Sequence, residues 1–151
     1  PVYKALYGRD FSYADFDQRM EMQKAIYLLQ DMGVPVGDYG FRWYLHGPYS
    51  QSLQDDMHYE SGRTCAELTL SKEYAERIAR LHDVIHSEAK GSYSISHWVE
   101  CLASLHYLRE NLLGFDADEE EVIGELEKRK QHLNDHNTNV AAYSLVEGLF
   151  S

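Results

Sequence analysis

The stretch that decides the fold covers residues 16–50 and reads FDQRMEMQKAIYLLQDMGVPVGDYGFRWYLHGPYS. Apolar residues recur at helical spacing in its first half, which predicts a helix over 15–32. The expected buried stripe consists of Phe16, Met20, Ile26, Tyr27 and Leu29. Gly33 ends this helix, and Pro35 two residues later prevents it from restarting. Residues 34–40 are therefore expected to form a loop.

Aromatic residues dominate the second half of this stretch. Their alternation with other residues predicts a short strand over 39–45, broken by the sequence His-Gly-Pro at 46–48. Ser50 is placed to cap a helix over 51–59. A second short strand over 65–70 would complete a small β-ribbon packed on the helices.

The rest of the chain reads as helix. One helix is expected over 73–90, and the next runs to Gly114 with Trp98, Leu102, Leu105, Leu108 and Leu112 on its buried face. Possible caps for the last three helices are Ser94 or Ser96, Asp116 or Asp118, and Asn137 or Asn139. The predicted fold is mostly α. We expect one globular domain over 1–151, a compact bundle of about five to six helices with a small β-ribbon or winged-helix-like element near residues 39–70.

The charge of the chain limits its partners. Its 151 residues carry 14 Lys+Arg and 25 Asp+Glu, a net charge of −11. The tight basic cluster at 128–130 closes a segment that begins with acidic residues at 116–121, an order that a helix dipole favours. Binding to nucleic acid or to an anionic membrane surface is therefore not expected. Two cysteines make no disulfide framework, and we expect a cytoplasmic protein.

The common catalytic motifs are missing from the sequence. It contains no Gly-x-Ser-x-Gly elbow, no P-loop and no Gly-x-Gly-x-x-Gly. Asp55 and Asp56 are adjacent, and neighbouring residues on a helix point about 100° apart, so they are poorly placed to share a proton. We accordingly assign no catalytic residue and no cofactor.

The most unusual run, residues 41–50, combines four aromatic residues with an arginine, a histidine and a Gly-Pro pair. One interpretation is an aromatic hinge that packs the ribbon onto the bundle. The other is a recognition corner, because Tyr, Trp and Arg are enriched at binding hot spots. The candidate partner-binding residues are Arg42, Trp43, Tyr44, His46, Gly47, Pro48, Tyr49 and Ser50.

Eight histidines raise the alternative of a metal site. His82 and His86 are four residues apart on one expected helix, as are His97 and Cys101, and the pair at 132 and 136 has the same spacing. A zincin, however, needs His-Glu-x-x-His, and here Asp83 follows the first histidine. The alternative is that these histidines lie on the flanks of helices without a metal, and that Cys101 is a buried, inert thiol.

Part of the chain resembles a known family. The segment QKAIYLLQ at 23–30, then Tyr-Gly-Phe at 39–41 and the run WYLHGPYS at 43–50, resembles the YwgA-like group of prokaryotic proteins and, more distantly, the Panacea antitoxin-associated domain. The resemblance covers mainly residues 16–57. It implies a mostly helical fold with a small winged or β-ribbon element. It also implies a role like that of Panacea domains, which are antitoxin modules that neutralise toxins by direct protein contact, and whose relatives act as adaptors to proteolysis.

The leading functional prediction is a non-enzymatic protein-binding module, antitoxin-like or a phage-defence accessory, that neutralises or adapts a basic partner such as a toxin. One alternative is a metal-dependent hydrolase or nuclease that uses the paired histidines. A second alternative is a winged-helix DNA-binding regulator. The sequence leaves the partner and the oligomeric state open, including a homo-oligomer.

Overall fold

The segment 16–50 folds as a long helix followed by a loop and a tight hairpin. A computed structural model describes residues 2–60, 72–114 and 116–150, and the expected strand at 65–70 lies outside these ranges. The helices are α1 (Val2–Tyr7), α2 (Phe16–Asp31), α3 (Gln51–Glu60), α4 (Lys72–Ile85), α5 (Ile95–Tyr107), α6 (Glu119–Arg129) and α7 (His136–Leu149). The strands are β1 (Arg42–Tyr44) and β2 (Gly47–Tyr49). This confirms the mostly helical fold with a small β element.

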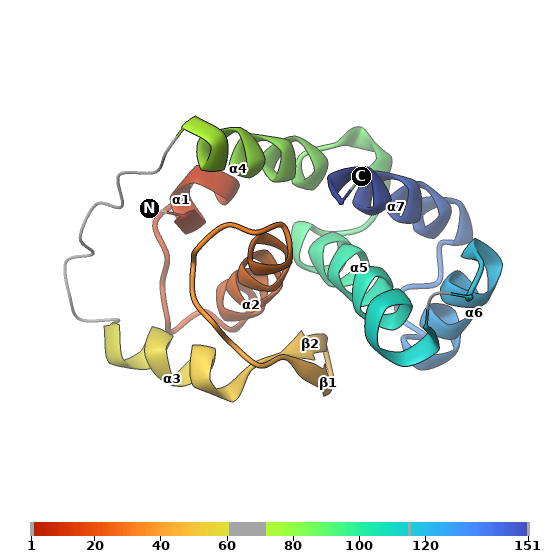
Figure 1. The fold of residues 1–151 in the computed structure, drawn as a ribbon, viewed down its shortest axis with the longest axis horizontal. Coiled ribbons are helices and arrows are strands. Elements are labelled where there is room, and N and C mark those ends of the chain that lie inside the picture. The colour runs from red at the N-terminus through yellow and green to blue at the C-terminus, as the bar shows by residue number, and fades with distance from the viewer. Residues whose placement is uncertain (1, 61–71, 115, 151) are drawn as a thin grey trace.

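Helices α2 and α5 lie at the centre of the molecule and pack against each other (Figure 1). Helices α4 and α7 run along one edge, whereas α3 and the hairpin occupy the opposite edge. The hairpin contacts both central helices. It therefore sits where residues from α2 and α5 meet, and this position decides which side chains lie beneath it.

One hydrophobic core joins side chains from α1 through α7. Trp98 on α5 is its largest fully buried side chain, and the indole Nε1 donates to Val84 O at 2.9 Å. This bond satisfies the polar atom of a buried tryptophan and ties α5 to α4. Helix α1, which the sequence analysis missed, is joined to α2 because the Tyr3 hydroxyl donates to Glu21 Oε1 at 2.7 Å.

Two glutamines of α2 position the chain that leads to and from the hairpin. The Gln23 side chain accepts from Ser50 N and donates to Ser50 O, both at 2.9 Å. Seven residues on, Gln30 makes the same pair of bonds with the backbone of Tyr39, at 2.8 and 2.9 Å. Since residues seven apart lie on one face of a helix, one face of α2 binds both ends of the segment 39–50 through these hydrogen bonds.

The strand expected over 39–45 forms, and its partner among the described residues is a segment that was not predicted as a strand. The expected strand over 39–45 shrinks to β1, and the Gly-Pro sequence expected to break it begins the partner strand β2. Register is antiparallel, with Arg42 opposite Tyr49 and Tyr44 opposite Gly47. Proline is tolerated here because, within the described ranges, the sheet consists of two strands and each is an edge strand.

Several helix boundaries differ from expectation. Helix α4 ends at Ile85 rather than continuing to Lys90, because Ser87 caps a separate short 3₁₀ turn, Glu88–Lys90. Asp135, not either of the expected asparagines, caps α7 by accepting from Thr138 N at 3.1 Å. The Ser94 and Asp118 caps are confirmed.

Two residues expected in buried stripes are exposed. Phe16 begins α2 and is 48% exposed. Leu112 is 45% exposed because α5 gives way at Leu108–Leu113 to a wider π-helical turn. This turn shifts the helical phase by which the stripe was predicted.

Candidate functional site

The hairpin turns tightly above the packed central helices. Leu45 and His46 form its two-residue loop, and Gly47 follows with a φ of 91°. L residues with a side chain rarely adopt this conformation. A Cβ at Gly47 would also collide with the hydroxyl of Ser104 on α5. Glycine at this position is thus required by both the backbone and the close packing.

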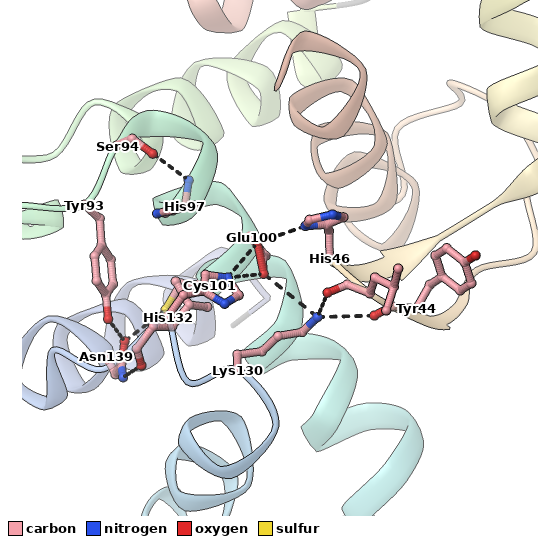
Figure 2. A network of polar contacts seen from close by, with 12 residues as sticks. Tyr44, His46, Tyr93, Ser94, His97, Glu100, Cys101, Lys130, His132 and Asn139 are labelled. Atoms are coloured by element: carbon pink, nitrogen blue, oxygen red, sulfur yellow. Dashed lines mark hydrogen bonds and ion pairs between the residues drawn. The ribbon is translucent and has the colours of Figure 1, made fainter. Parts of the chain in front are cut away.

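Lys130, which follows α6, holds the hairpin loop through hydrogen bonds (Figure 2). Its Nζ donates to Leu45 O and, at 3.2 Å, to Tyr44 O. The same ammonium lies 5.0 Å from the centroid of the Trp43 ring, within the range of a cation–π contact. Lys130 is only 4% exposed, and burial lowers its pKa while nearby Glu100 opposes that shift. These bonds hold the loop against the helical body.

Glu100 on α5 is the buried carboxylate at the centre of the network in Figure 2. Its Oε2 lies 2.9 Å from His132 Nε2 and 4.0 Å from Lys130 Nζ. His46 Nδ1 is 3.9 Å from the other carboxylate oxygen, Oε1. Burial lowers the pKa of His46, again against the opposing effect of Glu100. One carboxylate thus faces several basic groups drawn from the hairpin and from the connection after α6.

Lys24 on α2 is the second buried lysine of the site. It is 1% exposed, and its Nζ has no hydrogen-bond partner among the described residues. Burial lowers the pKa of Lys24 to about 7, and the charge of Lys130 lowers it further, although Glu100 acts in the opposite direction. Burial thus favours the neutral amine of Lys24 far more than that of an exposed lysine.

A pocket of about 200 Å³ opens between α2 and the hairpin. It is lined by Phe16, Arg19, Met20, Lys24, Tyr44, Leu45, His46, Tyr49 and Gln54. A second pocket of about 450 Å³ beside the hairpin shares Tyr44 and Tyr49 with the first. The two tyrosine rings lie 5.3 Å apart between centroids. They form a wall common to both pockets.

The candidate partner-binding residues divide into two groups. Arg42 and Tyr44 are exposed, and Trp43, His46 and Tyr49 are half-buried, so these five present surface around the hairpin. Gly47, Pro48 and Ser50 are buried. Their part is to shape the hairpin and the start of α3, where the Ser50 hydroxyl accepts from Leu53 N. The buried residues pack the hairpin onto the bundle, and the exposed and half-buried ones leave side chains accessible at its surface.

The histidine pairs do not assemble into a metal centre among the described residues, where no group of three or more possible ligands could hold an ion. The rings of His82 and His86 lie 4.5 Å apart, and His86 Nε2 lies 2.6 Å from Leu6 O. Cys101 is fully buried, donates weakly to Asn139 Oδ1 at 3.4 Å and has a pKa raised by burial. This thiol is inert by position.

The remaining histidines are also used singly. The His97 ring contacts that of His132 at a tilt, with centroids 5.1 Å apart, whereas Cys101 bonds to Asn139. His132 precedes α7 and contacts Glu100, whereas His136 begins α7 and contacts Glu127. The third pair therefore shares neither a helix nor a partner.

Sequence reasoning missed the buried ionisable residues. Lys24 and Glu100 both interrupt apolar runs of central helices, at Gln-Lys-Ala-Ile and Trp-Val-Glu-Cys. A charge inside an apolar stripe is the signal that would have found them, since charged side chains are seldom buried without a purpose or a partner. Lys130 gave no such signal, because it closes a basic cluster that reads as solvent-exposed.

The comparisons with known proteins do not extend the site. No family model, no curated protein and no solved structure matches this chain. The resemblance to YwgA-like and Panacea proteins stays a prediction from the residues quoted for it. Among the described residues, no helix is both long and apolar enough to cross a membrane.

Proposed function

We propose that this chain is a non-enzymatic protein-binding module that holds a basic partner protein on the surface around the hairpin. One observation carries the proposal. Among the described residues, five large hydrophobic side chains are exposed, and three of them, Phe16, Tyr44 and Leu45, line the same 200 Å³ pocket. Single exposed apolar residues are ordinary, but a cluster of them around a hollow is typical of a binding site.

The side chains around this pocket are held in place by the elements that carry them. Leu45, the most exposed of them at 72%, sits in a loop whose backbone oxygen accepts from buried Lys130. Phe16 packs edge-on against His46, with ring centroids 5.2 Å apart. A surface that is already ordered loses little conformational entropy when a partner binds, which favours affinity.

Charge supports a basic partner. The net charge of −11 attracts a positively charged protein and speeds their encounter. Asp55 on α3 lies near enough to Tyr49 to help raise its pKa, after the larger effect of burial. An acidic protein with an apolar, aromatic contact surface is the combination that an antitoxin-like or phage-defence accessory protein would need to neutralise or adapt a basic toxin.

Site-specific photo-cross-linking in the native host tests this proposal. A photoreactive phenylalanine analogue replaces Leu45 in one variant and Leu112, equally apolar and 45% exposed, in a matched control. We expect one basic protein to be cross-linked through position 45 and not through position 112. Cross-linking that is equal at both positions, or absent at 45 while the protein is folded, would contradict the proposal.

A further inference from the structure

Three features of Lys24 together point to a chemical role for its side chain. It lines the 200 Å³ pocket, yet it is 1% exposed and its Nζ has no hydrogen-bond partner among the described residues. A buried ammonium without hydrogen bonds is strongly disfavoured, so the amine is best accommodated without its proton. A desolvated lysine beside another cation, here Lys130, is the arrangement that makes an amine nucleophilic near neutral pH.

The other buried lysine provides a contrast within the same site. Lys130 is 4% exposed, but its Nζ donates to two hairpin carbonyls and lies against the Trp43 ring. An ammonium held by these bonds has no lone pair with which to attack a carbonyl group. Burial alone does not distinguish the two lysines. Lys24 has an amine without a hydrogen-bond partner among the described residues, and its side chain also lines the pocket.

We propose that this pocket takes a small aldehyde or ketone and that Lys24 holds it as an imine. The inference does not rest on the proposed protein contact, since it depends on the Lys24 amine and not on a partner protein. The apolar side chains of Phe16 and Leu45 would surround the carbon chain of such a ligand. Its carbonyl group would meet the amine.

The reaction needs no oxidant or reductant. The Nζ lone pair attacks the carbonyl carbon, a C–N bond forms, and the π electrons of the carbonyl move to its oxygen. Nitrogen loses a proton and oxygen gains one, which gives a carbinolamine. Loss of the hydroxyl group as water, with a second proton from nitrogen, leaves the C=N bond. The imine is a reversible attachment of the ligand.

His46 is the side chain placed to move these protons. It lines the same pocket as Lys24, and its Nδ1 lies 3.9 Å from Glu100 Oε1. A neutral imidazole has one nitrogen that donates and one that accepts, so it can take the proton from nitrogen and return one to oxygen. His46 is a positioning and proton-transfer group in this scheme, not the site of attachment.

Reductive trapping with propanal tests the proposal. The folded protein is treated with propanal and cyanoborohydride between pH 6 and 10, and the propylated lysines are identified by peptide mass spectrometry. Since an exposed lysine is almost fully protonated at pH 7, Lys24 should react at least about tenfold faster than exposed Lys128 there. Labelling of Lys24 should saturate with propanal concentration, whereas that of Lys128 should rise linearly.

Three comparisons make the test decisive. Lys130 in the same sample should label more slowly than Lys24, because its amine is hydrogen-bonded. The variant Lys24→Met supplies the blank for the Lys24 peptide, and His46→Asn should slow labelling of Lys24 severalfold without changing Lys128. Labelling of Lys24 that is absent, unsaturable or no faster than that of Lys128 at pH 7 would overturn the carbonyl site. An unchanged rate in His46→Asn would overturn the role of His46.

Discussion

Two independent features of the structure require glycine at position 47. Its φ of 91° and the Ser104 hydroxyl beside it both exclude a side chain. We expect Gly47→Ala to lower the free energy of unfolding by about 2–4 kcal/mol, through backbone strain and overpacking together. Urea denaturation measures this change.

Gly124 offers a matched control for that substitution. It lies inside α6, where a Cβ would meet no heavy atom within 4 Å. Gly124→Ala should raise the free energy of unfolding by up to about 1 kcal/mol, because alanine is the better helix former. If Gly47→Ala were as harmless as Gly124→Ala, the packing described for the hairpin would be wrong.

Lys24 makes stability depend on pH in a direction that can be worked out. Its pKa is about 7 in the folded protein and about 10.4 in an unfolded chain. Between these values the unfolded state binds more protons, so the contribution of Lys24 to stability becomes more favourable as the pH rises from 7 to 10. Glu100, Lys130 and His46 surround this amine in the wild-type protein.

The variant Lys24→Met keeps an unbranched side chain, one heavy atom shorter, and loses its charge. We expect it to be more stable than the wild-type protein at pH 7, by an amount on the order of a few kcal/mol. This advantage should shrink as the pH approaches 10. Thermal or urea unfolding of both proteins at several pH values measures it, and a difference independent of pH would show that the Lys24 amine is not the titrating group.

At the scale of elements, α2 acts as a template for the segment that follows it. Gln23 and Gln30 pair with backbone at Ser50 and Tyr39. Gln23→Ala should lower the free energy of unfolding by about 2–3 kcal/mol, because it leaves a buried donor and a buried acceptor unpaired. Gln30→Ala should cost less, since Gln30 and Tyr39 are half-buried and water can replace the amide. Equal losses would contradict this description of the clamp.

Glu100 connects α5 with the hairpin and with the connection between α6 and α7. Glu100→Gln keeps the shape and removes the charge that faces Lys130 and His132. We expect a loss of about 2–4 kcal/mol in the free energy of unfolding, because the buried ammonium of Lys130 is left without its counter-ion. Glu120→Gln, on the exposed face of α6, should change it by less than about 0.5 kcal/mol. Similar small effects in both variants would contradict a central role for Glu100.

Much of the helical pattern could be predicted from periodicity, and the failures have local causes. The stripe of α5 holds from Trp98 to Leu108 and fails at Leu112, where the π-helical turn changes the phase. The hairpin escaped prediction because strands of three residues show too little alternation, and because Gly-Pro normally marks a break. The local pattern of residues does not specify which segments pair as strands, as β1 and β2 do here.

At the scale of the whole molecule, the sequence singled out the region around the hairpin, but not which of its side chains are exposed. It selected eight of the residues between 42 and 50, yet it could not tell that Tyr44 is exposed while Pro48 is buried. Phe16 and Leu45 were not chosen, because one was assigned to a buried stripe and the other to a strand. Only the folded chain brings Phe16, from the start of α2, to the same pocket as the hairpin loop.

The affinity of Leu45→Ser for the cross-linked partner tests most directly whether the apolar surface around this pocket binds a protein. Leu112→Ser is the matched control, and unfolding midpoints establish that both variants are folded. We predict that Leu45→Ser weakens binding at least about tenfold, as loss of a hot-spot side chain does, and that Leu112→Ser leaves it within about twofold. A folded Leu45→Ser that binds as tightly as the wild-type protein, or two variants weakened equally, would contradict the account.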